Sequence, residues 1–399
     1  MHALKVDPRD RRRVIDGDAG LAGLDAAVRR LLPPALYHYL AGASEDEATQ
    51  ARNLRAFGEY GFLPRVLVDV SRRSPATTLF GSERPLPFGI APMGFSRLIA
   101  PDGDIALACA AAEAGIPFIL SGASLTRMEE VRAAGRTSWF QAYVPGEPER
   151  VAALVDRVEA AGFDTLVITA DTAVHPKHER AARHGFRSPV KPSLGLAWQG
   201  LSRPGWLRRV LFRDRLAALA FRFENMDAGQ GPPVFSASLI RDIGRRDALS
   251  WQHVEAVRRR WKGKLVLKGL MAADDVAIAE KAGVDGVIVS NHGGRQIDCA
   301  ASSLVALDRI AQSGPRLTLM HDGGIRRGGD VLKALKLGAD FVFVGRPMLM
   351  AAAIGGRSGA AEAIALLAEE IDIAMALLGI DRLAGLAAVE LLHDRGAAT

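Results

Sequence analysis

The chain has 399 residues, of which 49% are hydrophobic and 24% charged, with a formal net charge of +6. These values are ordinary for a soluble globular protein, and no nucleic-acid motif accompanies the basic excess. The two cysteines, Cys109 and Cys299, lack disulfide-rich or metal-like spacing, and no signal peptide or membrane span is recognisable, so we expect no metal site and a cytoplasmic protein.

In chain order, residues 1–84 are expected to form a mainly helical extension. Eight short apolar segments of β-type follow, at 87–92, 117–121, 138–144, 164–171, 264–269, 285–291, 316–322 and 340–345. Helix-like segments lie between them, for example at 103–115, 148–162, 273–283 and 328–338. Several of these end in glycine directly before the next strand, which is a normal helix stop.

Strands that alternate with helices predict a parallel sheet, and their near-continuous apolar sequences predict burial on both faces. Eight such units favour an α/β fold of the (β/α)8 TIM-barrel type over about 85–355. A doubly wound open sheet is the alternative, disfavoured because no G-x-G-x-x-G follows the first strand. We expect one domain over 1–399, with a long insertion at about 172–263 and C-terminal helices at 360–392.

Polar or glycine-rich residues follow each of the eight predicted strands. In a barrel these positions converge on one mouth, where active sites lie. The residues, in chain order, are Pro92, Met93 and Gly94, Ser121, Gln141 and Tyr143, Thr169 and Asp171, Lys268, Ser290, His292 and Arg295, Asp322, Gly323, Gly324, Ile325 and Arg326, and Gly345 and Arg346. One such strand end could simply mark where burial stops, but eight together predict a functional site.

The last two strand ends carry a phosphate signal. "DGGIRRG" at 322–328 and "GRP" at 345–347 place glycine amides and arginines where barrel enzymes commonly bind phosphate. Lys268, at the end of an apolar strand, is either a rim lysine with its head in solvent or a cation that faces an anionic partner inside.

These motifs resemble the FMN-dependent L-2-hydroxy acid dehydrogenases and oxidases, the glycolate oxidase, lactate dehydrogenase and mandelate dehydrogenase type. "SNHGGRQID" at 290–298 is specific to that family, together with "LKG", "DGGIRRG" and "GRP" at matching intervals. The resemblance covers nearly the whole chain and is strongest to the mandelate and lactate dehydrogenase branch. It implies an FMN cofactor and the oxidation of a 2-hydroxy acid to the 2-oxo acid.

By the same resemblance, His292 falls on the catalytic base and Asp171 on its carboxylate partner. Tyr39, Tyr143 and Arg295 fall on substrate-binding positions. The flavin contacts would be Pro92, Met93, Gly94, Ser121, Gln141, Thr169, Lys268 and Ser290, and the ribityl-phosphate contacts Asp322, Gly323, Gly324, Ile325, Arg326, Gly345 and Arg346. A histidine base, an orienting aspartate and an arginine fork also suit this chemistry on physical grounds.

Two positions depart from the family pattern. Gly94 stands where many oxidases have alanine, which leaves room beside the flavin and favours a dehydrogenase with a bulkier substrate. His178 stands where the family places a further substrate-facing arginine. Three interpretations follow: His178 replaces the arginine and makes affinity pH-dependent, Arg180 reaches the substrate instead, or neither residue matters because a larger substrate makes its contacts elsewhere.

The electron acceptor is left open by the sequence. The first hypothesis is a dehydrogenase that passes electrons to a quinone or a protein. The alternatives are an oxidase that uses oxygen and forms hydrogen peroxide, and a flavin-binding protein with weak turnover. The family resemblance also implies a homo-oligomer.

Residues 197–223 combine aromatic residues and leucines, such as Trp198, Trp206 and Phe212, with six arginines. This composition fits a segment that lies on anionic lipid, which would place the protein peripherally on the inner face of the plasma membrane. An amphipathic segment packed on the barrel or on a neighbouring subunit fits it equally well.

Overall fold

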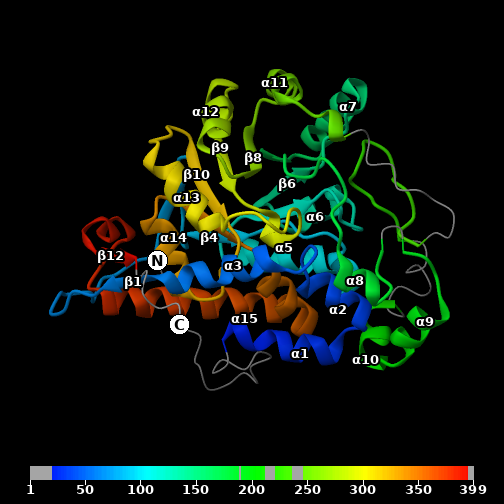
Figure 1. The fold of residues 1–399 in the computed structure, drawn as a ribbon, viewed down its shortest axis with the longest axis horizontal. Coiled ribbons are helices and arrows are strands. Elements are labelled where there is room, and N and C mark those ends of the chain that lie inside the picture. The colour runs from blue at the N-terminus through cyan, green and yellow to red at the C-terminus, as the bar shows by residue number, and fades with distance from the viewer. Residues whose placement is uncertain (1–19, 188–189, 212–220, 236–245, 394–399) are drawn as a thin grey trace.

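The computed structural model describes residues 20–187, 190–211, 221–235 and 246–393. Its centre is a closed barrel of eight parallel strands, in the order β10-β11-β4-β5-β6-β7-β8-β9 (Figure 1). The strands are β4 (Phe88–Ile90), β5 (Phe118–Ser121), β6 (Ser138–Ala142), β7 (Thr165–Thr169), β8 (Lys264–Leu270), β9 (Gly286–Val289), β10 (Thr318–Asp322) and β11 (Phe341–Val344). All eight predicted strands and the predicted TIM barrel are confirmed.

Large apolar side chains fill the barrel interior, and a hairpin closes the end at which the strands begin. Trp139, Met320 and Phe343 are among the inward-facing residues, each at most 3% exposed. The hairpin of β2 (Thr77–Leu79) and β3 (Ser82–Arg84) adds Leu79 and Phe80 to this cluster. Because Phe80 lies beside the first residues of β8 and β9, the hairpin covers the N-terminal ends of the strands. The opposite, C-terminal mouth is left for the site.

Helices surround the barrel on the outside. They are α4 (Ser96–Ile99), α5 (Gly103–Glu113), α6 (Met128–Ala134), α7 (Pro148–Ala160), α11 (Trp251–Arg260), α12 (Ala273–Lys281), α13 (Ser303–Gln312), α14 (Gly328–Lys336) and α15 (Arg346–Leu378). Helices α5 and α15 pack against each other, and α1 (Leu24–Leu31) lies along α15 (Figure 1).

The predicted C-terminal helices at 360–392 need correction. Helix α15 begins at Arg346, is kinked at Gly356 and ends at Leu378. Gly379 adopts a left-handed backbone with φ of 69°, and a side chain there would meet the carbonyl oxygen of Arg65 at 2.5 Å, so the helix stops. A 3-10 segment, η8 (Leu383–Ala388), and the strand β12 (Glu390–His393) follow.

The N-terminal extension is also less helical than expected. It contains the short helices α1, α2 (Pro34–Ala41) and α3 (Ala48–Ala56), but also β1 (Tyr60–Leu63) and the β2–β3 hairpin. Strand β1 pairs antiparallel with β12, so this part of the N-terminal extension and the last described strand lie together at one edge of the molecule. Helices α2 and α3 lie beside the barrel mouth. There Oγ1 of Thr49 accepts a hydrogen bond from the backbone amide of Ala300, in the loop after β9.

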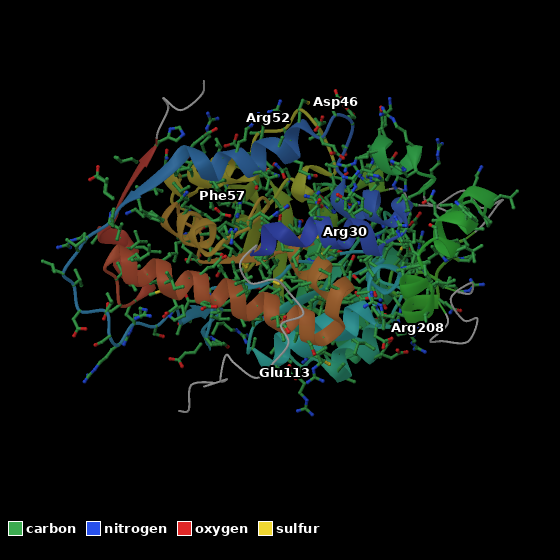
Figure 2. The ribbon with its side chains drawn as sticks, turned by 90° about the horizontal axis from the view of Figure 1, so that it is seen from below. Arg30, Asp46, Arg52, Phe57, Glu113 and Arg208 are labelled. Atoms are coloured by element: carbon green, nitrogen blue, oxygen red, sulfur yellow. The ribbon has the colours of Figure 1, made fainter. Side chains whose placement is uncertain are left out.

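The insertion after β7 lies at the other end of the molecule from β1 and β12 (Figures 1 and 2). It contains α8 (Glu179–Arg183), α9 (Leu194–Leu201), α10 (Pro204–Trp206), the π-helical turn η4 (Leu207–Leu211) and the 3-10 turn η6 (Arg246–Ala248). Arg208 marks this end in Figure 2.

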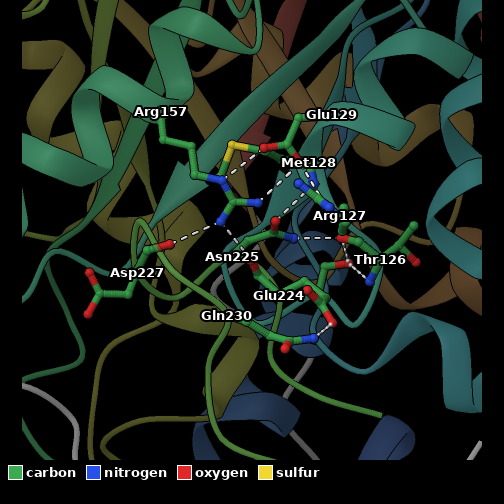
Figure 3. A network of polar contacts seen from close by, with 10 residues as sticks. Thr126, Arg127, Met128, Glu129, Arg157, Glu224, Asn225, Asp227 and Gln230 are labelled. Atoms are coloured by element: carbon green, nitrogen blue, oxygen red, sulfur yellow. Dashed lines mark hydrogen bonds and ion pairs between the residues drawn. The ribbon is translucent and has the colours of Figure 1, made fainter. Parts of the chain in front are cut away.

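One stretch of the insertion is anchored firmly on the barrel helices (Figure 3). The buried Asn225 donates to the carbonyl of Thr126 at 2.7 Å and accepts from the amide of Met128 at 2.8 Å. Arg157 joins the same network by donating to Glu129 and to the carbonyl of Glu224. Residues around Asn225 are therefore held to α6 and α7.

Candidate active site

The strand ends open into a cavity of about 550 Å3 at the C-terminal mouth. Sixteen of the predicted site residues line it: Tyr39, Pro92, Met93, Gly94, Tyr143, His178, Lys268, His292, Arg295, Asp322, Gly323, Gly324, Ile325, Arg326, Gly345 and Arg346. Asp171 and Ser290 contact lining residues. Ser121, Gln141 and Thr169 are buried at the ends of β5, β6 and β7. The fold thus brings together residues from across 300 positions of sequence.

His292 and Asp171 form a hydrogen-bonded pair. The Nδ1 atom of His292 lies 3.0 Å from Oδ1 of Asp171. This contact orients the ring and leaves Nε2 for another partner. The backbone of His292 has a positive φ of 56°, and its amide donates to Oγ of Ser290 at 3.0 Å. Ser290 therefore supports the turn that carries the histidine away from the strand.

The glycines after His292 allow a close approach of helix α3. A side chain at Gly294 would lie 2.6 Å from the backbone nitrogen of Gln50. The same helix carries Asn53, which pairs with Asn291 after β9. The side-chain amide of each asparagine donates to the side-chain oxygen of the other at 2.8 Å. Sequence reasoning missed this buried pair, because nothing in the chain order shows that α3 packs on the turn after β9.

Arg295 is fixed by the N-terminal extension. Its Nη1 atom donates to the carbonyl oxygens of Tyr39 and Gly42 at 2.7 and 2.9 Å. Its guanidinium carbon lies 4.7 Å from the centre of the Tyr39 ring. Because one end of the guanidinium is held by backbone oxygens, the other end can offer donors to an anion in the cavity.

Lys268 lies inside the barrel mouth and is not a rim lysine, because it is 3% exposed. Its Nζ atom lies 2.9 Å from Oδ2 of Asp322 and donates to Oγ of Ser290 at 2.8 Å. Burial disfavours the ammonium, but Asp322 and Asp171 outweigh burial and raise the pKa of Lys268. Burial likewise disfavours the Asp322 carboxylate. The positive charge of Lys268 outweighs this effect of burial and lowers the pKa of Asp322. The pair is therefore charged at neutral pH.

Two half-buried arginines, Arg326 and Arg346, mark the end of the cavity that follows β10 and β11. Arg346 donates through Nη2 to the carbonyls of Gly293 and Gly42 at 2.8 and 3.1 Å. Burial, together with the nearby Arg295 and Arg326, lowers the pKa of Arg346 to about 9. Burial also lowers the pKa of Arg326. Neighbouring cations that disfavour one another in this way are stabilised when an anion binds between them.

The cavity has features that fit the expected FMN. The Nε2 atom of Gln141 and the Oγ1 atom of Thr169 are buried without a hydrogen-bond partner, which is costly unless a ligand provides one. At Gly345 a side chain would have its nearest neighbour only at 3.6 Å, so this backbone is open to the cavity. The half-buried arginines and the glycine amides that follow β10 and β11 suit a phosphate.

The structure places His178 and Arg180, the two residues of the insertion for which the sequence suggests contact with the substrate. His178 lines the cavity, and its Nε2 atom lies 2.9 Å from the carbonyl oxygen of Arg295. Burial and the positive charge of Arg295 lower the pKa of His178 to about 4, so it is neutral at physiological pH. Arg180 instead donates to Nδ1 of His38 at 2.8 Å and pairs with Glu47. Neither residue thus places a positive charge on the cavity, and the role of this position in substrate binding stays a prediction.

Sequence reasoning also missed Arg246. This residue lines the cavity from the insertion, is 6% exposed, and has its guanidinium carbon 4.5 Å from the centre of the Tyr143 ring. The basic sequence "GRRDALS" at 244–250 contains the residue but gives no sign that it faces inward.

Comparisons with known proteins agree with this geometry. The sequence model of the family described as FMN-dependent dehydrogenase matches residues 28–392. An L-lactate dehydrogenase of Caulobacter vibrioides is 38% identical over 356 residues, which cover 89% of this chain and 92% of that protein. The monotopic membrane protein (S)-mandelate dehydrogenase superposes with a TM-score of 0.82 at 33% identity, covering 93% of this chain and 98% of the other. Mandelate oxidase with benzoyl-formic acid gives a TM-score of 0.77 at 33% identity, covering 94% and 98%.

Proposed function

The chain belongs to the FMN-dependent dehydrogenase family, and from this premise we propose how its residues carry out the reaction. The protein is an FMN-dependent 2-hydroxy acid dehydrogenase that acts on L-2-hydroxy acids such as lactate or mandelate. The observation that supports the residue roles is the convergence of His292, Arg295 and Lys268 on one cavity.

His292 is proposed as the general base. With Nδ1 committed to Asp171, Nε2 faces the cavity and accepts the proton of the substrate hydroxyl. Asp171 keeps the ring oriented and stabilises the imidazolium that results. When bound, FMN accepts the two electrons that leave with the α-hydrogen. The 2-oxo acid is then the oxidised product, and the proton remains on His292.

Arg295 is proposed to hold the substrate carboxylate. Its rigid attachment to Tyr39 and Gly42 fixes the distance between the carboxylate and His292. Lys268, charged by its pairing with Asp322, provides a permanent positive charge at the buried side of the site. That charge favours any negative charge that builds up there during the reaction.

For the electron acceptor we propose a quinone or a protein, in a dehydrogenase. Gly94 supports this choice, because a side chain there would approach Ala123 and the hydroxyl of Tyr39 at 3.1 and 3.4 Å, so glycine enlarges the substrate side of the cavity. The test is steady-state oxidation of L-2-hydroxy acids with a quinone and, separately, with oxygen. Reduction of the quinone without hydrogen peroxide supports the dehydrogenase, whereas stoichiometric peroxide in air would identify an oxidase.

A membrane contact is proposed through α9. Leu194, Trp198 and Leu201 on this helix are 92%, 71% and 62% exposed, while Gln199 anchors it by accepting from the amide of Ala35 at 2.8 Å. One structural relative is monotopic, and no described helix of this chain has the length and apolar character to cross a bilayer. An exposed apolar helix beside arginines suits an anionic lipid surface.

The described aromatic residues of 197–223 that lie outside α9 do not share this exposure. Trp206 is buried and donates to the carbonyl of Leu98 at 2.8 Å, and Phe221 and Phe223 are buried. Phe212 lies outside the described residues. The packed interpretation therefore holds for these described aromatic residues, and the lipid interpretation is confined to α9.

Flotation with anionic vesicles tests the membrane proposal. Replacing Leu194, Trp198 and Leu201 together by serine should abolish flotation and leave turnover of a soluble substrate unchanged.

The homo-oligomer expected from the family stays a prediction, which light scattering in detergent-free buffer can check.

A further inference from the structure

One peptide group of the N-terminal extension holds two arginines of the site. The carbonyl oxygen of Gly42, the residue directly after α2, accepts from Nη1 of Arg295 at 2.9 Å and from Nη2 of Arg346 at 3.1 Å. Arg295 is proposed to hold the substrate carboxylate, and Arg346 lies at the end of the cavity that suits the phosphate of FMN. The positions of both cations therefore depend on the direction of one carbonyl group.

The amide of the same peptide group is held by Glu47. The carbonyl of Gly42 and the N–H of Ala43 belong to one planar peptide, and in its usual trans form they point in opposite directions. The N–H of Ala43 donates to Oε1 of Glu47 at 3.1 Å. This contact on one side of the peptide therefore aims the carbonyl at the arginines on the other side. Because the carboxylate is a charged acceptor, it also polarises the peptide and makes its carbonyl a better acceptor.

The glycine at position 42 leaves the space that this contact needs. A side chain there would come within 2.4 Å of the carbonyl oxygen of His38 and within 3.1 Å of Oε1 of Glu47. Glycine also restricts its own backbone angles less than any other residue. The direction of the Gly42 carbonyl must therefore be fixed by contacts, and the contact with Glu47 acts on the same peptide.

The turn between α2 and α3 holds Glu47 in a strained backbone conformation. Glu45 and Glu47 have positive φ angles of 47° and 63°, which are unfavourable for residues other than glycine. Two distant segments hold the turn: the amide of Ser44 donates to the carbonyl of Gly294 at 3.0 Å, and the amide of Glu45 donates to that of Lys177 at 2.9 Å. Strain of this kind clusters at functional sites, and here it accompanies a carboxylate that lies behind two arginines of the site.

Arg180 of the insertion binds the other oxygen of this carboxylate. Its Nη1 atom donates to Oε2 of Glu47 at 2.9 Å, and its Nε atom donates to Nδ1 of His38 on α2. Helix α8, which carries Arg180, lies beside α2 (Figure 1). The side chain of Glu47 is 21% exposed, so the ion pair is partly shielded from water. One carboxylate oxygen is thus bound to the peptide and the other to the insertion.

We propose that Glu47 is a positioning residue that sets both arginines through the peptide between Gly42 and Ala43. For Arg295 the inference rests on the proposed function, and for Arg346 it rests on the FMN cofactor of the family. A single side-chain contact then links binding of the substrate carboxylate to binding of the cofactor phosphate. The ion pair of the same carboxylate extends this link to the insertion.

The experiment compares the full-length wild type with Glu47→Ala, Glu47→Gln and Arg180→Met. Glu280→Ala is the matched control, because Glu280 on α12 also accepts from an arginine side chain and a backbone amide, both of Arg316, and is 24% exposed. The cofactor readout is the Kd of FMN and of riboflavin, which lacks the phosphate, from quenching of flavin fluorescence. The substrate readout is the Kd of phenylacetate and of its uncharged amide, phenylacetamide, from difference spectra of the FMN-loaded protein. Neither readout requires turnover.

Glu47→Ala should weaken FMN and phenylacetate each about tenfold, with riboflavin and phenylacetamide within about threefold of wild type. Glu47→Gln keeps an acceptor for the amide of Ala43 and should restore part of both losses. Arg180→Met should show the same selective pattern to a smaller extent, because it leaves the carboxylate in place. Glu280→Ala should leave all four dissociation constants within about threefold of wild type.

A merely structural role of Glu47 would weaken the charged and the uncharged ligands alike. Equal weakening within either pair of ligands, a loss confined to FMN or to phenylacetate, or no loss beyond about threefold overturns the proposal. If Glu47→Ala does not fold, Glu47→Gln and Arg180→Met decide by the same comparison. If no L-2-hydroxy acid reduces the wild-type flavin, the proposed function fails, and the comparison of FMN with riboflavin still decides whether Glu47 positions Arg346.

Discussion

The two sides of the active-site cavity are built differently. On the barrel side, Lys268 and Asp322 stand at the ends of buried strands and pair with each other at 2.9 Å. On the insertion side, His178 directly precedes the short helix α8 and Arg246 begins the 3-10 turn η6, both within the long segment after β7. The comparison teaches that the barrel side of the cavity carries its charged pair on buried strands, whose positions the framework fixes, whereas the insertion side carries its polar residues on short connecting elements.

The largest expected effect is on the barrel side. His292→Asn keeps the size of the side chain but removes the base, so flavin reduction by an L-2-hydroxy acid should fall about 100- to 10,000-fold. Stopped-flow reduction in the absence of oxygen measures it. FMN content should stay at the wild-type level, and a variant that is reduced at a near-normal rate would show that another group takes the proton.

A second test concerns the buried ion pair. Lys268→Met leaves Asp322 charged and unpaired, which should lower the free energy of unfolding by about 3–5 kcal/mol. Lys264→Met, at the exposed start of the same strand, breaks its contact with Asp285 and should cost about 0–1 kcal/mol. Urea unfolding of both variants measures the two losses. Equal losses would contradict the claim that the buried Lys268–Asp322 pair contributes more to stability than the exposed Lys264–Asp285 pair.

The pH dependence of this pair has a definite sign. The lowered pKa of Asp322 gives stability that is present above its unfolded pKa and is lost as pH falls through the folded value. The raised pKa of Lys268 gives stability that is present below its unfolded pKa and is lost as pH rises through the folded value. The contribution of the pair should thus be constant from about pH 5 to 9.

Arg295→Lys should have an intermediate effect. Lysine cannot bind Tyr39 and Gly42 and a carboxylate at the same time, so kcat/KM for L-2-hydroxy acids should fall roughly 10- to 100-fold. Steady-state kinetics with saturating acceptor measure it. An unchanged kcat/KM would mean that the carboxylate binds elsewhere.

The smallest effect should come from the insertion. Because its pKa of about 4 leaves His178 neutral, His178→Ala should change KM by less than about tenfold and equally at each pH between about 5.5 and 8.5. The first of the three sequence interpretations, in which His178 replaces the arginine, predicts instead a KM that rises as the pH increases through a histidine pKa near neutrality. If the wild-type KM rises with pH in this way and the His178→Ala variant loses that dependence, His178 does take the place of the arginine.

Much of the barrel side could be predicted from the sequence. Strands buried on both faces have continuous apolar sequences such as "GVIV" at 286–289, and polar residues directly after them fall at the mouth by the geometry of the fold alone. The short strands β1 and β12 were not predicted, because they are held by pairing between distant segments. The contact of Arg246 with Tyr143 also depends on the path of the insertion, which has no sequence periodicity to reveal it.

The central claim is that one mouth binds FMN and an L-2-hydroxy acid together, and anaerobic titration of the FMN-loaded protein tests it most directly. L-lactate or L-mandelate should bleach the flavin absorbance at a stoichiometry of one per chain, with the corresponding 2-oxo acid formed, and the D enantiomers should leave it unchanged. A flavin that stays oxidised with every L-2-hydroxy acid, or bleaches equally with both enantiomers, would contradict the account.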